Sequence, residues 1–180
     1  KVTEYVGIGY DVSELVDKTE KLTERLYKDP LTRLPNRVKL LTDLSEIRSC
    51  LTLILLNVDG FKEINSFFGH QVGDAVLRDL GGELVNLCAE VPMAHVYKLP
   101  VDEYAILVKG VHGRDLIERQ VRTLSETISR KAFSPGEEDI SLNVTAGIAS
   151  CSGVTGCDGG QRELLTRSDM AMKLAKKLRQ

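Results

Sequence analysis

The chain has 180 residues, with 24 basic and 26 acidic side chains and a formal net charge of −2. This length suffices for one domain with a buried core and a short appendage. The near-neutral charge argues against a protein that binds nucleic acid by neutralising many phosphates, so no nucleic-acid partner is predicted. The longest apolar stretch is far too short to span a membrane and no signal-peptide pattern opens the chain, so we expect a soluble, cytoplasmic fragment without membrane contact.

The N-terminal part predicts a connection to another domain. Residues 1–10 alternate like a strand but have no evident partner, which suggests the end of a preceding domain. Residues 11–28 predict a helical linker that ends at Asp29-Pro30, because proline cannot continue the helix. This helix either packs on its own domain or dimerises as a coiled coil, and the pattern leaves both readings open. Its apolar seam consists of Val12, Leu15, Thr19, Leu22 and Leu26.

The remaining patterns alternate between helical and strand periodicity. Together they predict an α+β domain with a ferredoxin-like antiparallel sheet flanked by helices, an architecture shared by analogy with nucleotide cyclases and polymerase palms. The expected helices are 36–48, 60–68, 73–90, 114–131 and 162–179. The expected strands are 51–58, 93–99, 102–109 and 139–150, with a hairpin at Pro100-Val101.

Polar side chains gather where the apolar strand 51–58 ends. Asn57, Asp59 and Gly60 occupy this strand end, where acidic oxygens and backbone N–H groups can hold a metal ion against phosphates. Further on, Asn65 and Asp74 have side chains that can read the edge of a nucleotide base. Both also have structural alternatives, Asn65 in a turn and Asp74 as a helix N-cap.

These residues resemble the DxDxFKxxNxxxGHxxGD run of the GGDEF domain of bacterial diguanylate cyclases. Three further segments are similar to blocks of the same family, over about 150 residues in all. Residues 29–180 are therefore identified as a GGDEF domain. The segments are Asn57-Val58-Asp59-Gly60-Phe61-Lys62 with Asn65, Gly69-His70 and Gly73-Asp74; Asp29-Pro30-Leu31-Thr32-Arg33-Leu34-Pro35-Asn36-Arg37; Asn143 to Ala149; and Ser168 to Lys176.

The resemblance implies a reaction in which two GTP molecules form cyclic di-GMP across a dimer interface, assisted by Mg²⁺. The family's metal ligands correspond to Asn57, the backbone carbonyl of Val58, and Asp102. The catalytic candidates are Asp102 and, next to it in the signature hairpin, Glu103. The nucleotide-binding positions carried over from the family are Asn65, Asp74, Phe61, Lys62 and Lys176.

Several of these positions depart from the family pattern. Asn57 places a neutral amide where a carboxylate would hold the metal, and we expect Asp59 to point to the other side of the chain and not to replace it. Pro100 and Val101 replace both signature glycines, and Val101 tolerates positive φ badly. The turn can still close as another type, but it should crowd the place where GTP would lie. Gln180 replaces a phosphate-binding arginine. The family's inhibitory RxxD motif is also absent, with Val91 and Ala94 at its two positions.

The departures predict a catalytically impaired GGDEF domain that acts as a regulatory, GTP-binding or dimerisation module in cyclic di-GMP signalling. An active diguanylate cyclase and a scaffold without nucleotide binding are the alternatives. Mg²⁺ is expected only with bound nucleotide, and weakly. The expected partners are GTP, a second copy through the N-terminal helix, and neighbouring sensor and EAL domains. The expected location is the cytoplasm, with the cytoplasmic part of a membrane-anchored sensor as the alternative.

The four cysteines show neither CxxC nor zinc-ligand spacing. We therefore expect reduced packing residues, as is usual in the cytosol. Cys151 and Cys157 lie in one glycine-rich segment and form a disulfide as the alternative under oxidation.

Overall fold

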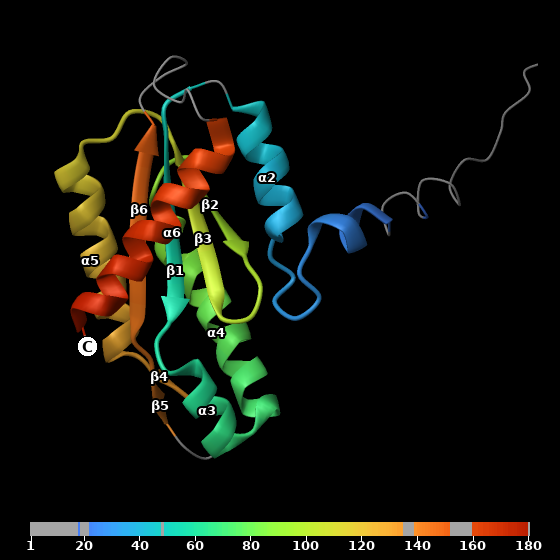
Figure 1. Ribbon diagram of the computed structural model, residues 1–180. Helices are drawn as coiled ribbons and strands as arrows, with labels where there is room; N and C mark the ends of the chain where they lie inside the picture. Colours follow the sequence, from blue (N-terminus) through green and yellow to red (C-terminus); the bar gives the residue numbers. More distant parts are fainter. Residues whose placement is uncertain (1–17, 19–21, 48, 135–138, 152–159, 180) are drawn as a thin grey trace, which may run out of the picture.

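A computed structural model describes residue 18 and residues 22–47, 49–134, 139–151 and 160–179. Its centre is a four-stranded antiparallel sheet in the order β2-β3-β1-β6 (Figure 1). The strands are β1 (Leu51–Val58), β2 (Ala94–Lys98), β3 (Glu103–Lys109) and β6 (Val144–Cys151), and a separate small pair is formed by β4 (Ala132–Phe133) and β5 (Ile140–Ser141). The helices are α2 (Arg37–Glu46), α3 (Phe61–Phe68), α4 (His70–Cys88), α5 (Arg114–Arg130) and α6 (Gly160–Arg179).

Two hydrophobic cores lie on opposite faces of this sheet. The alternate residues Leu51, Leu53 and Leu55 of β1 pack with α2 and α6, and the residues between them pack with α4 and α5. All eight residues of β1 are buried, as the continuous apolar run predicted for a central strand. The sheet order and helical layers confirm the predicted ferredoxin-like arrangement, and they place Asn57 on the α6 face.

Two boundaries and the burial of one residue differ from the sequence predictions. The predicted strand 139–150 is divided into β5 and β6, and β5 pairs with β4, which was not predicted. The helix expected from Gly73 begins at His70, because Gly69 adopts a φ of 83° and turns the chain directly out of α3. Val38, which was expected on the buried side of its helix, is 45% exposed.

Gly147 explains how closely α6 lies on β6. A Cβ atom at this position would stand 2.1 Å from the backbone oxygen of Ser168 and 2.4 Å from the backbone nitrogen of Met172. Neither backbone atom can move without displacing the helix. A side chain at residue 147 is therefore incompatible with the observed packing.

The described part of the N-terminal linker is helical at residues 22–27. Leu22 and Leu26 are 65% and 53% exposed, so this end of the seam is not packed on the domain. The expected strand 1–10, the helix start at residue 11, Cys157 and Gln180 lie outside the described residues. Within the described part, none of the helices has the length and apolarity needed to cross a membrane.

Two cysteines agree with the prediction and one does not. Cys50 and Cys88 are free, and burial raises the pKa of the Cys88 thiol to about 11, which makes it a packing group and not a nucleophile. Cys151 is disulfide-bonded, which contradicts the expectation that it is reduced.

Candidate functional site

Three side chains from three elements meet at the end of β1. The Nδ2 of Asn57 donates a hydrogen bond to Oδ1 of Asp102 at 3.1 Å, and the Nζ of Lys176 on α6 donates to Oδ1 of Asn57. The amide thereby connects an ammonium group to a carboxylate, and Asn57 is only 5% exposed. The amide suits this arrangement because it offers a donor to Asp102 and an acceptor to Lys176 at once, whereas an ionised carboxylate offers no donor.

The same three side chains fit a protein-held Mg²⁺ poorly. Magnesium prefers carboxylate oxygens in an octahedral shell, and here Asp102 is the one carboxylate at the inferred ligand positions. The amide oxygen of Asn57 already accepts the ammonium of Lys176, and a nearby positive charge opposes a cation. Within the described ranges, no group of three or more His, Cys, Asp or Glu side chains is arranged to hold a metal.

The signature hairpin keeps an unusual backbone. Val101 has a φ of 63°, so the turn contains a left-handed residue although valine disfavours this conformation. The buried ammonium of Lys98 holds this turn: its Nζ donates to the carbonyl oxygens of Leu99 at 2.5 Å, Val101 at 2.9 Å and Glu103 at 3.4 Å.

Lys98 is 4% exposed and also lies over the ring of Tyr104, with Nζ 5.0 Å from the ring centroid. Burial lowers its pKa, while the nearby carboxylates of Asp29, Asp102 and Glu103 act in the opposite direction. A cation that serves three carbonyl groups is well compensated for its burial. Lys98 is therefore a positioning residue for the hairpin.

Glu103, the second catalytic candidate, is half-buried beside this cation. Burial raises the pKa of its carboxyl group, and the charges of Asp102 and Asp169 raise it further, whereas Lys176 and Lys98 lower it. A carboxyl group with a raised pKa can hold a proton closer to neutral pH than an ordinary glutamate.

Asp59 lies on the same face as Asn57, contrary to the prediction. Its Oδ1 accepts a hydrogen bond from the hydroxyl of Thr145 at 2.7 Å, and Thr145 is the partner of Asn57 in the β1–β6 register. Residues two apart on a strand share a face, and the backbone bond from Asp59 to Asn143 continues that geometry past the end of β1. Asp59 is thus a second carboxylate at this end of the sheet.

The two expected base-reading residues lie where α3 meets α4. Asn65 on α3 faces Gly73 on α4 so closely that a Cβ at residue 73 would stand 2.0 Å from its Oδ1. That oxygen is buried and has no hydrogen-bond partner among the described residues. A buried acceptor without a donor is costly, and a ligand donor reached by rotating the amide would satisfy it.

Asp74 is exposed within the first turns of α4. Its structural alternative as the N-cap is wrong, since Gly69 occupies that position.

Phe61 is buried in the core beneath α4, whereas Lys62 is exposed, so of these two only Lys62 is accessible to a phosphate. The N–H of Val58 donates to the carbonyl of Asp102 at 3.1 Å, which ties the strand end to the hairpin.

Sequence reasoning did not single out Thr145, Asp169 or the role of Lys98. For Lys98 a signal was present, because it stands where the family's signature has an arginine immediately before the turn. Thr145 and Asp169 come close to β1 and β3 only through the folded sheet and α6.

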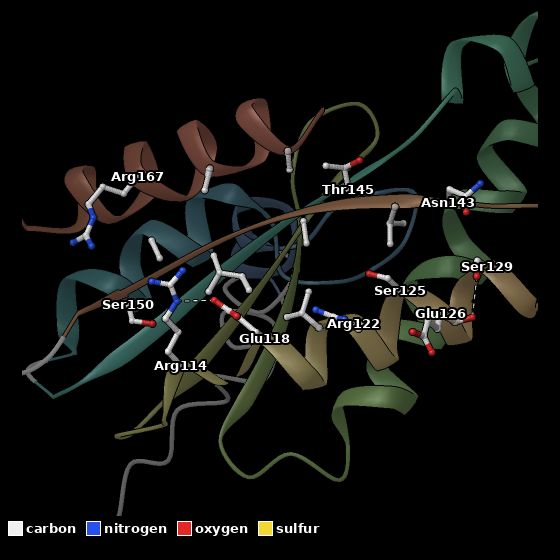
Figure 2. Close-up of a pocket in the computed structure, with 17 residues that line it drawn as sticks. Arg114, Glu118, Arg122, Ser125, Glu126, Ser129, Asn143, Thr145, Ser150 and Arg167 are labelled. Carbon is white, nitrogen blue, oxygen red and sulfur yellow. Dashed lines mark hydrogen bonds and ion pairs between the residues drawn. The ribbon is translucent and has the colours of Figure 1, made fainter. Parts of the chain in front are cut away.

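A hollow of about 840 Å³ runs along β6 between α5 and α6 and is lined at one end by Thr145 (Figure 2).

Comparison with known proteins decides the family. The family model described as "Diguanylate cyclase, GGDEF domain" matches residues 26–180. The chain belongs to this family. Diguanylate cyclase DgcZ of Escherichia coli (strain K12) is 32% identical to this GGDEF domain over 133 residues, which is 71% of the chain and 44% of DgcZ. Diguanylate cyclase TpbB of Pseudomonas aeruginosa (strain UCBPP-PA14) is 29% identical over 195 residues, covering 98% of the chain and 43% of TpbB.

The fold agrees with solved GGDEF structures. The crystal structure of the coiled coil and GGDEF domain of DgcB from Caulobacter crescentus, in complex with c-di-GMP, superposes with a TM-score of 0.80 at 19% identity. The match covers 92% of this GGDEF chain and 88% of that one, and at this identity it shows the fold alone. The chain spans less than half the length of DgcZ and TpbB.

Proposed function

We propose that this GGDEF domain has lost most or all cyclase activity and serves as a GTP-binding regulatory module in cyclic di-GMP signalling. The observation that carries the proposal is the bridge from Lys176 through Asn57 to Asp102. Diguanylate cyclases of this family generally use Mg²⁺ with GTP. Here the family's first carboxylate is replaced by Asn57, whose side-chain oxygen accepts a hydrogen bond from the ammonium group of Lys176. The positive charge that a metal would bring to the phosphates is supplied in part by Lys176.

Two features support retained nucleotide binding. The unpartnered Oδ1 of Asn65 lies beside Gly73, which precedes Asp74 in α4, at the place inferred for the guanine base. The exposed Lys62 and the partly exposed Lys176 lie at or near the strand end inferred for the phosphates. Such a site binds GTP by base contacts and fixed cations, and its affinity depends little on a divalent ion.

The test combines a binding and a product measurement on the chain. GTP is titrated with and without Mg²⁺, and conversion of GTP to cyclic di-GMP is followed with Mg²⁺ and with Mn²⁺. Saturable binding without product supports the proposal. Absence of saturable binding at millimolar GTP contradicts it and leaves a scaffold whose task is contact with neighbouring domains.

An active diguanylate cyclase is the second candidate, favoured by the retained carboxylates Asp102 and Glu103 and by the left-handed turn at Val101. Cyclic di-GMP that disappears in Glu103→Ala would establish this alternative. The variant with Asn57→Asp, Pro100→Gly and Val101→Gly restores the family pattern at the metal position and the turn. We expect this variant to bind GTP more tightly with Mg²⁺ than the parent chain does.

A further inference from the structure

The outer edge of β6 carries an unusual set of features. Within the described part of the chain, β6 is the last strand of the sheet and pairs on one side only, with β1. Its sequence VTAGIASC contains no proline or lysine, and its register with β1 is continuous from Val144 to Cys151 without a bulge. Proteins usually protect an edge of this length with such devices, because it can pair with another strand.

The hydrogen-bonding direction of each edge residue follows from the register. The N–H of Asp59 donates to Asn143, so residues 143, 145, 147 and 149 direct their backbone groups toward β1. Ala146, Ile148 and Ser150 therefore direct their N–H and C=O groups outward into the hollow beside β6. Among the described residues, the backbone hydrogen bonds of the turns and loops include none to these outward groups.

The α5 wall of the hollow carries charges in an alternating row. Arg114, Glu118, Arg122 and Glu126 are four residues apart, lie on one face of α5 and line the hollow (Figure 2). If α5 packs antiparallel against a copy of itself, with the axis between Glu118 and Arg122, every arginine meets a glutamate. Arg114 then faces Glu126 of the copy, and Glu118 faces Arg122 of the copy. The charges of this row therefore complement those of the same row on a second copy. A partner surface of a single charge sign would not match them.

The opposite wall, α6, contributes one charged side chain, Arg167, and two small apolar ones to the hollow. Ala171 and Ala175 line it, and small residues allow two helices to approach to about 8–10 Å. Leu174 and Leu178 stand three residues from these alanines on the neighbouring flank and are 59% and 80% exposed. Exposed leucines beside an open strand edge are typical of a surface that is covered in an assembly.

We propose that β6 pairs antiparallel with β6 of a second copy of this chain, forming one continuous eight-stranded sheet. Ile148 lies on the twofold axis opposite Ile148 of the copy, and Ala146 lies opposite Ser150. Each of the three outward N–H groups on each strand then donates to a carbonyl across the axis. The helices α5 and α6 pack against their own copies on the two faces, with the alternating charges paired on α5 and the leucines covered on α6.

This arrangement has a consequence for the nucleotide ends of the two domains. Thr145, next to Asn57, lies at one end of β6, and antiparallel pairing places the copy's Thr145 at the other end of the shared sheet. Two GTP molecules cannot meet across such an interface. The paired state is thus non-productive for the family's reaction, and it uses a surface different from the N-terminal helix.

Sedimentation equilibrium of the 180-residue chain over a concentration series tests the proposal. We expect a monomer–dimer equilibrium. Ser150→Pro removes one outward N–H per copy and leaves the ladder to β1 intact, and it should weaken the dimer at least about tenfold. Ser150→Ala, which keeps the N–H, is the matched control and should leave the dimer unchanged.

The charge row supplies an independent arm at exposed positions, which guards against loss of fold in the proline variant. Glu118→Arg should weaken the dimer roughly tenfold, because it creates two like-charge contacts across the axis. Glu118→Arg combined with Arg122→Glu restores opposite charges and should recover the dimer. A chain that stays monomeric overturns the proposal. So does a dimer that Leu22→Glu with Leu26→Glu abolishes and that Glu118→Arg leaves unchanged.

Discussion

Asn57→Asp replaces the amide nitrogen at the centre of the site with a carboxylate oxygen. We expect this variant, unlike the parent chain, to be stabilised by Mg²⁺. The substitution replaces the donor that now reaches Asp102 at 3.1 Å with a second carboxylate, while Lys176 gains an ion pair with residue 57. A hydrogen bond to a charged group contributes about 1.5–3 kcal/mol, and the new ion pair offsets part of its loss. We expect a net destabilisation of about 1 kcal/mol without metal, which lowers Tm by about 2–4 °C for a domain of this size.

Mg²⁺ should reverse this loss in the variant and leave the parent chain unaffected. At a Mg²⁺ concentration ten times its Kd, binding to the folded state adds about 1.4 kcal/mol, or roughly 3–6 °C in Tm. Thermal unfolding of both chains in EDTA and in a Mg²⁺ series measures the difference. Asn57→Ala is the control, because it removes the amide without adding a carboxylate and should not respond to Mg²⁺. An equal Mg²⁺ response in the parent chain would refute the reasoning.

Three further substitutions test other parts of the site. Gly73→Ala places a methyl group against Oδ1 of Asn65 and should weaken GTP binding about tenfold, measured by titration; unchanged affinity would exclude Asn65 as a base contact. Val101→Gly relieves the left-handed valine and should raise the free energy of unfolding by about 0.5–1 kcal/mol in urea denaturation, whereas a loss would contradict the strain argument. Glu103→Gln should raise Tm at pH 7 but not at pH 4. The raised pKa means that the stability contributed by protonated Glu103 is present below its ordinary value of 4.5 and is lost as pH rises through the folded-state pKa.

Most of the fold was predictable because its signals are local. The central strand 51–58 is a continuous apolar run, and the structure buries all of it. The split of residues 139–150 was not predictable, because β5 pairs with β4 across a connection whose sequence has no strong strand pattern. The start of α4 was predicted three residues late because Gly73 was read as the end of a turn. In the structure Gly69 makes that turn, and Gly73 serves close helix packing.

The residues of the site were predictable from the sequence, but the hydrogen bonds between them were not. Asn57, Asp102 and Lys176 were identified from the resemblance, but their bridge depends on α6 lying against β1, which is a tertiary feature. The side taken by Asp59 was predicted wrongly, although strand periodicity places it with Asn57. The left-handed conformation of Val101 was not predictable from residue propensity, because three hydrogen bonds from Lys98 stabilise this turn only in the folded structure.

The central claim is that Lys176 and Asn57 replace a metal-binding arrangement, so that GTP binds without a divalent ion. Isothermal titration of the chain with GTP, once in EDTA and once in excess Mg²⁺, tests this claim most directly. The account predicts saturable binding in both buffers with dissociation constants within about threefold of each other, less than 1 kcal/mol apart. Binding that appears only with Mg²⁺ would contradict it, because the carboxylates of Asp59 and Asp102 would then hold the metal despite Lys176.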